Sequence, residues 1–163
     1  MTVRGMFRPG MRAYLVPLVA GVALAVSAFL PWVRVGDVRL AGVPDTTALW
    51  IVALGVLAAV LATLSLITRK NSRHPLLLIG LVALGLMFLS WRLAPRAVAE
   101  RVLTRSQALA IVEGTPITSA PSTIVGSGIY LGLGASCAIV GFGLTIVVKR
   151  AARPYVIEPD DDV

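Results

Sequence analysis

Four long runs of this sequence lack any charged side chain or histidine. They cover residues 13–30, 48–68, 76–91 and 124–148. A charge in the middle of a bilayer costs free energy unless it has a partner or a task, so intramembrane charges usually mark ion paths, proton relays or metal sites. The runs therefore predict membrane spans without such chemistry. The missing carboxylate also argues against a proton-coupled exporter, because small four-span exporters depend on a membrane-embedded acid.

Cysteine and histidine are almost absent. Cys137 is the only cysteine and lies in the fourth run, which excludes an intrachain disulfide, a Cys-x-x-Cys redox pair and a thiolate metal cage. His74 is the only histidine, which excludes a haem or zinc site with two or more histidines from this chain alone. As a ligand, His74 could bind a pigment or metal only jointly with another subunit. No phosphate-binding glycine loop, His-Glu-x-x-His motif or Ser–His–acid set is present. We therefore expect no enzymatic activity and no cofactor or metal site.

The overall composition of the chain is that of a membrane protein. Of the 163 residues, 57% are hydrophobic and 14% are charged, and a soluble domain of this size cannot bury four such runs. Because a span needs roughly 20 apolar residues, we predict an all-α integral membrane protein, with a four-transmembrane-helix bundle in residues 1–153. The expected spans are about 13–30, 48–68, 75–92 and 124–148, with outer loops 31–47 and 93–123 and an acidic cytoplasmic tail at 154–163.

The net charge of +7 is distributed asymmetrically about the runs. Basic clusters precede the first run, fill the connection between the second and third, and follow the fourth. They consist of Arg4, Arg8, Arg12, Arg69, Lys70, Arg73, Lys149, Arg150 and Arg153. By the positive-inside rule, this placement predicts a multi-pass membrane protein with both termini in the cytoplasm. Beside a membrane, such clusters favour anionic lipid headgroups over nucleic acid, so we expect lipid partners and no nucleic acid.

The N-terminal segment has two interpretations. Basic residues, an apolar stretch and the small residues Val26-Ser27-Ala28 imitate a cleaved secretory signal. We favour an uncleaved first span, because the stretch is long enough to cross and Leu30-Pro31-Trp32 is typical of a helix end with an interface residue.

Four aromatic residues provide an independent test of this orientation. Each lies near the expected outer end of a span: Trp32, Trp50, Trp91 and Tyr130. Interfacial Trp and Tyr are common because the ring is apolar while its N–H or O–H requires a polar partner. We predict that these residues are depth anchors at the outer interface rather than ligand contacts.

Small residues recur along the second and fourth spans. The predicted packing residues are Gly55 and Ala62 in the second span and Gly128, Gly132 and Ser136 in the fourth. In lipid, helices associate through close approach at small residues rather than through hydrophobic burial. These positions predict helix contacts within the protomer or, as an alternative, an interface with another chain.

The first outer loop has the alternation of a β-hairpin. A Gly36-Asp37 turn places Val35 opposite Val38, Arg34 opposite Arg39 and Val33 opposite Leu40. Two arginines directly opposite repel each other. Either an anion, such as a lipid phosphate or a partner's carboxylate, lies between Arg34 and Arg39, or both side chains extend into water.

The second outer loop predicts an amphipathic helix. Pro95 suits a first helical position, residues 96–113 contain no Gly or Pro, and Gly114 follows as a stop signal. Such a helix would lie on the outer membrane surface, dock on a partner or cap the bundle. Residues 115–123 read as an extended, proline-containing return to the membrane.

With Leu30-Pro31-Trp32 closing the first span before a β-like loop, the chain resembles small uncharacterised four-span bacterial inner-membrane proteins. It is also loosely similar in hydropathy to claudin-type proteins, but lacks their paired loop cysteines. The resemblance assigns no functional residue. We expect a non-catalytic accessory, assembly or structural subunit of a larger bacterial membrane complex of respiratory or photosynthetic type, in contact with other membrane subunits. The alternative is a self-associating carrier or channel for an apolar or lipid-like molecule.

Overall fold

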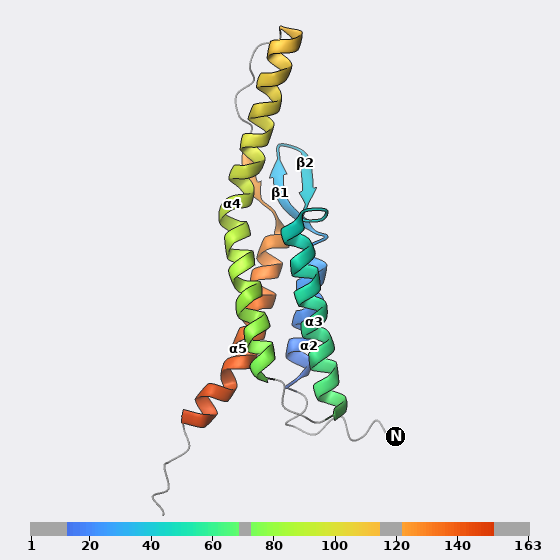
Figure 1. Ribbon diagram of the computed structural model, residues 1–163, viewed down its shortest axis with the longest axis vertical. Helices are drawn as coiled ribbons and strands as arrows, with labels where there is room; N and C mark the ends of the chain where they lie inside the picture. Colours follow the sequence, from blue (N-terminus) through green and yellow to red (C-terminus); the bar gives the residue numbers. More distant parts are fainter. Residues whose placement is uncertain (1–12, 69–72, 115–121, 152–163) are drawn as a thin grey trace, which may run out of the picture.

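The computed structural model describes residues 13–68, 73–114 and 122–151. Within them the chain forms four helices and a three-stranded sheet (Figure 1). The helices are α2 (Leu15–Ser27), α3 (Thr46–Thr68), α4 (Arg73–Glu113) and α5 (Ser127–Ala151); the strands are β1 (Pro31–Val35), β2 (Val38–Ala41) and β3 (Thr123–Val125). Outside the described residues lie the acidic tail at 154–163, most of the return segment at 115–123, and Arg4, Arg8, Arg12, Arg69, Lys70 and Arg153.

Three helices are long and apolar enough to cross a membrane. The qualifying segments are Thr46–Thr68, His74–Glu113 and Ser127–Thr145. The first expected span is shorter than predicted, because α2 ends at Ser27 and the chain turns before β1 begins at Pro31. Its 13 residues reach about 20 Å at 1.5 Å per residue, less than the ~30 Å hydrocarbon core.

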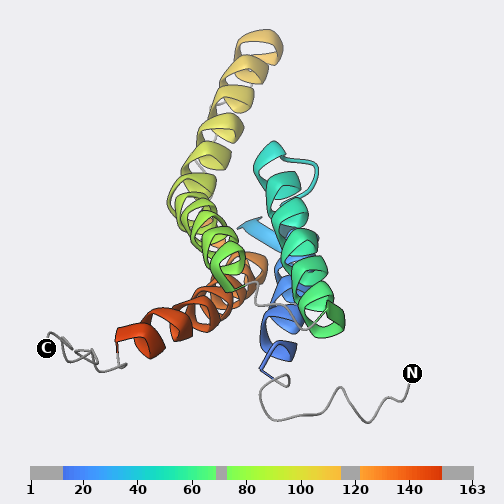
Figure 2. The same cartoon turned by 60° about the horizontal axis from the view of Figure 1, so that its bottom comes forward.

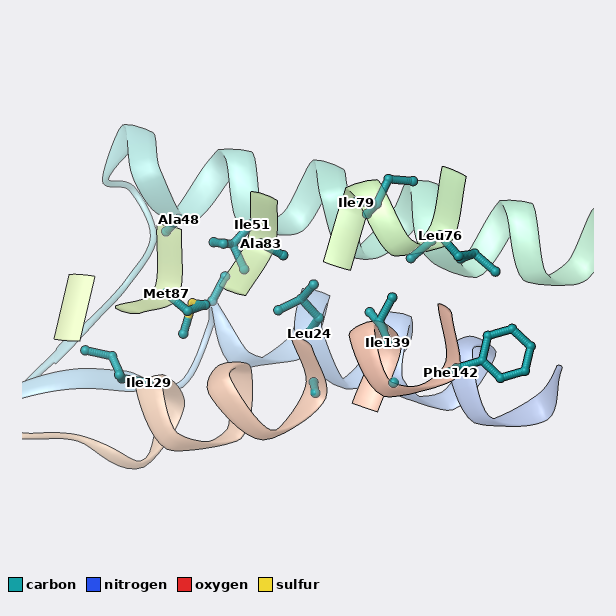
Figure 3. Packing of buried hydrophobic residues seen from close by; sticks show 14 of the residues in the cluster. Leu24, Ala48, Ile51, Leu76, Ile79, Ala83, Met87, Ile129, Ile139 and Phe142 are labelled. Carbon is teal, nitrogen blue, oxygen red and sulfur yellow. The ribbon is translucent and has the colours of Figure 1, made fainter. Parts of the chain in front are cut away.

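The helices form a four-cornered bundle. Helix α2 packs along α3 and α5, while α4 packs along α5 and over a shorter stretch along α3. Helices α2 and α4 therefore occupy opposite corners (Figures 1 and 2). All four helices contribute fully buried side chains to the core between them, among them Leu24, Ile51, Leu76, Met87, Ile129 and Ile139 (Figure 3).

Helix α4 corrects one prediction. Pro95 does not begin a separate helix but lies inside a single 41-residue helix that continues past the sheet (Figure 1). Proline removes one hydrogen-bond donor and crowds the carbonyl one turn earlier, which usually ends or kinks a helix. Here Ala94 and Val98, on either side of Pro95, pack against the core and favour helical continuation.

The sheet has the strand order β2-β1-β3, with both pairings antiparallel. The hairpin of β1 and β2 has the predicted register: Val33 opposite Leu40, Arg34 opposite Arg39 and Val35 opposite Val38. Gly36, in the turn, has a φ of 56° that suits glycine.

The third strand is a second correction. Residues 124 and 125, predicted to begin the fourth span, belong to β3, and α5 starts only at Ser127. Strand β3 pairs with β1, placing Ile124 opposite Arg34. Gly126 then donates its N–H to the Trp32 carbonyl at 2.7 Å, so the start of α5 is attached to the end of α2 through the sheet.

Candidate functional site at the sheet end of the bundle

The buried polar side chains of the bundle form hydrogen bonds within their own helices. In the described part of the chain the buried polar side chains are Ser27, Ser65, Ser90 and Ser136. Their hydroxyls donate to carbonyls of their own helices at 2.6, 2.8, 2.8 and 2.8 Å. These serines therefore do not cross-link the helices. Across residues 13–68, 73–114 and 122–151, no group of three or more His, Cys, Asp or Glu side chains could hold a metal ion.

The small residues of α3 face the protomer's own core. Gly55 and Ala62 are both buried. A Cβ at Gly55 would lie 2.7 Å from the carbonyl oxygen of Gly21, and one at Gly21 would lie 2.8 Å from the carbonyl oxygen of Gly55. The backbones of α2 and α3 thus touch where the two glycines meet, a contact that any side chain would block.

The small residues of α5 face inward as well. Gly128 lies against the Ser27 carbonyl and the Trp32 ring, Gly132 lies against Met87 and the Ser27 hydroxyl, and Ser136 is fully buried. A Cβ at Gly134 or Gly141 would instead meet open space. Helix α5 therefore has one small-residue face in the bundle and further glycines on its outer surface.

Trp32 requires a correction as an interface anchor. Its side chain is only 4% exposed, and its Nε1–H donates to the Ser27 carbonyl at 2.9 Å. The indole lies between Gly42 and Gly128, where a Cβ at either glycine would be within 2.8 Å of a ring atom. Trp32 is therefore a core residue that closes the top of α2, with its polar atom already paired.

The other three predicted anchors lie on the protein surface. Trp50, Trp91 and Tyr130 are 62%, 36% and 59% exposed. All three lie toward the sheet end. Trp50 and Tyr130 are in the first two turns of α3 and α5, which begin there, and Trp91 is one turn before Ala94, which lines a cavity with Val33 of β1. The Arg92 guanidinium lies 6.0 Å from the centroid of the Trp91 ring, within cation–π range.

The sheet presents two chemically different faces. Val33 and Leu40 on one face line a cavity of about 300 Å³ together with Ala94 and Val98 of α4. Asp45 and Arg101 contribute charged side chains to the same cavity, which sequence reasoning missed because its walls come from distant segments. The apolar face of the sheet is thus directed at α4.

Arg34 and Arg39 lie on the other face. Their Cα atoms are register partners, both side chains are exposed, and Ile124 occupies the next position across the sheet. Within the described residues, neither arginine forms an ion pair with a carboxylate. In the described part of the chain, therefore, no carboxylate compensates the repulsion between them, which leaves this role to solvent or to a bound group.

Two open apolar grooves run beside α2. The groove between α2 and α3 has a volume of about 450 Å³ and includes Gly21, Gly55 and, near the end of α2, Phe29. The groove between α2 and α5 has a volume of about 580 Å³ and includes Ala20, Gly134 and, near the start of α5, Tyr130. In both, small residues form part of a shallow channel with branched apolar residues beside them.

Comparison of the chain with protein-family models, with curated proteins and with solved structures found no match.

Proposed function

We propose that this chain is an integral protein of the bacterial inner membrane, with α2 to α5 in the bilayer and both termini in the cytoplasm. In this placement, the apolar residues 13–14 and 28–30 on either side of the short helix α2 complete the first crossing. The charge-free runs, together with the exposed Trp50, Trp91 and Tyr130 near the sheet end, support this placement. The basic clusters that follow the second and fourth runs support a cytoplasmic location for the opposite end.

Within that membrane we propose a non-catalytic accessory or assembly subunit of a larger complex. The observation that carries this proposal is the arm of α4, which we define as Arg96–Glu113. Helix α4 has 41 residues, about 60 Å at 1.5 Å per residue, which is roughly twice the thickness of the hydrocarbon core. At the end of the arm, Ile111 and Val112 are 85% and 83% exposed.

An exposed apolar pair on a rigid projecting helix is suited to contact another subunit. Large apolar side chains that leave water on contact contribute about 25 cal/mol per Å². The proposed role is therefore one of contact and positioning.

Native purification of the full chain tests this role. In mild detergent we expect the wild type to retain other membrane subunits, and Ile111→Asp/Val112→Asp to lose them. The matched control is Gln107→Asp/Ala108→Asp, which adds the same charge to exposed positions of the same arm. Wild-type protein that runs only as a lone protomer or a self-oligomer would contradict the proposal.

The grooves beside α2 favour a second candidate, a self-associating carrier or channel for an apolar or lipid-like molecule. Their walls are almost wholly apolar and they open to the bundle's surface. This candidate predicts that purified protein in vesicles accelerates movement of a fluorescent lipid between leaflets. An unchanged rate at high protein density would contradict it.

A further inference from the structure

The arginine face of the sheet and the grooves beside α2 can be placed relative to each other through the position of α4. The apolar face of the sheet is directed at α4, so the face with Arg34 and Arg39 points away from α4. Since α2 and α4 occupy opposite corners, that direction is the side of α2. Strand β1 also follows α2 after a short turn, which places the arginines beyond the end of α2.

Both grooves extend along α2 toward the sheet. One has Phe29 near its sheet end and the other has Tyr130. The pair of arginines is thus placed beyond two apolar channels that flank a single short helix. This arrangement is complementary to a phospholipid, in which one charged headgroup is joined to two apolar chains.

We propose that this side of the protein binds one anionic phospholipid, with its phosphate between Arg34 and Arg39 and its acyl chains in the grooves flanking α2. The inference rests on the membrane placement proposed above but not on the accessory role. Guanidinium groups match phosphate oxygens with paired, charge-assisted hydrogen bonds. A bound phosphate would also compensate the repulsion across the Arg34–Arg39 pair.

The height of the arginines suits a headgroup. The height is counted from Pro31, the first residue of β1, which the proposed placement puts at the edge of the hydrocarbon core. Arg34 lies three residues further along the strand, a distance of about 10 Å at 3.3 Å per residue. The polar layer on each side of the hydrocarbon core is roughly 5–8 Å deep. Long arginine side chains commonly extend back along an apolar surface to reach this layer, which covers the remaining distance.

A lipid fits better than the carboxylate of a protein partner. A carboxylate would compensate the arginines but would leave both grooves unfilled. In the groove between α2 and α5, Gly134 is open enough that a Cβ added there would contact nothing within 4 Å. An acyl chain gains free energy with each methylene it buries, and its flexibility suits a shallow channel.

Native mass spectrometry of the full chain with phosphatidylglycerol and phosphatidylcholine tests the headgroup site. We expect the wild type to retain phosphatidylglycerol selectively, and Arg34→Gln/Arg39→Gln to bind it about tenfold or more weakly. The matched control, Arg92→Gln/Arg96→Gln, removes the same charge from exposed arginines of α4 and should bind as the wild type does. Equal weakening in both double variants would overturn the proposal.

A second pair of variants tests the grooves. Gly134→Leu fills the channel between α2 and α5, whereas Gly141→Leu adds the same bulk to an open position of α5 that does not line it. Only Gly134→Leu should weaken phosphatidylglycerol binding, and glycerol phosphate, which lacks chains, should not displace the lipid. Displacement by glycerol phosphate would contradict binding of the chains. Conversion of a dimer to a monomer by Gly134→Leu, without lipid loss, would assign the groove to a second copy and overturn the proposal.

Discussion

At the scale of single residues, Trp32 connects parts of the chain that are distant in sequence. Its ring lies against Gly42 and Gly128, and its N–H is bonded to the Ser27 carbonyl. The same tryptophan thus fixes the end of α2, the segment after β2 and the start of α5. Trp50, by contrast, lies on the surface and contacts little of the protein.

This difference predicts unequal effects of removing the two rings. We expect Trp32→Ala to lower the free energy of unfolding by about 3–5 kcal/mol, because it leaves a cavity and removes the hydrogen bond from the indole to the Ser27 carbonyl. Trp50→Ala should change it by less than about 1 kcal/mol, because that ring is largely exposed. Thermal unfolding in detergent measures both changes. Similar losses in the two variants would show that Trp32 is not a core residue.

At the scale of elements, α4 determines how far the protein reaches beyond the bundle. The helix passes through Pro95 without a break, and Ala94 and Val98 pack against the core on either side of it. An unbroken helix is stiff, so a contact made at Ile111 or Val112 holds the bundle at a defined distance. A separate surface helix, as the sequence predicts, would lack this property.

Spin labels on α4 test its continuity. In a Cys137→Ala background, labels at the exposed Leu78 and Gln107 lie on the same face of the helix. Pulsed electron paramagnetic resonance should give a single distance near 43 Å, from a rise of 1.5 Å per residue. A right-angled break at Pro95 would shorten it to about 30 Å. A main population at the shorter distance would contradict the continuous helix.

At the scale of the whole molecule, the charged segments and the sheet divide the protein into two unlike ends. The basic clusters adjoin one end of the helices, and the sheet and the arm of α4 extend from the other. In our proposed placement, the first lies in the cytoplasm and the second faces the opposite compartment.

Labelling of single cysteines tests this orientation. In the Cys137→Ala background, a thiol reagent that cannot cross the inner membrane should modify Gln107→Cys in cells whose outer membrane has been permeabilised. The same reagent should modify Asp161→Cys only after lysis. The reverse pattern would place the C-terminus outside, and labelling of both sites before lysis would show that α5 does not cross the membrane.

The sequence predicted the features that depend on neighbouring residues. The hairpin register follows from alternation around Gly36-Asp37, and the burial of Gly55 and Ala62 follows from the small residues that recur along the second span. It missed features that depend on distant segments. In the sequence, Ile124 belongs to an apolar run typical of a membrane span, and only its pairing with β1 makes it a strand residue. Pro95 similarly suits the first position of a helix, and only the packing of Ala94 and Val98 shows why the helix continues through it.

The position of β1 in the middle of the sheet has a consequence for biosynthesis. One edge of β1 pairs with β2, which follows it directly, but the other pairs with β3, which is made only after α3 and α4. Until Ile124 emerges from the ribosome, one edge of β1 has no partner strand. Completion of the sheet therefore joins α2, the first of the described helices to be made, to α5, the last of them. A nascent chain that stops before this step exposes the open edge of β1 to other proteins.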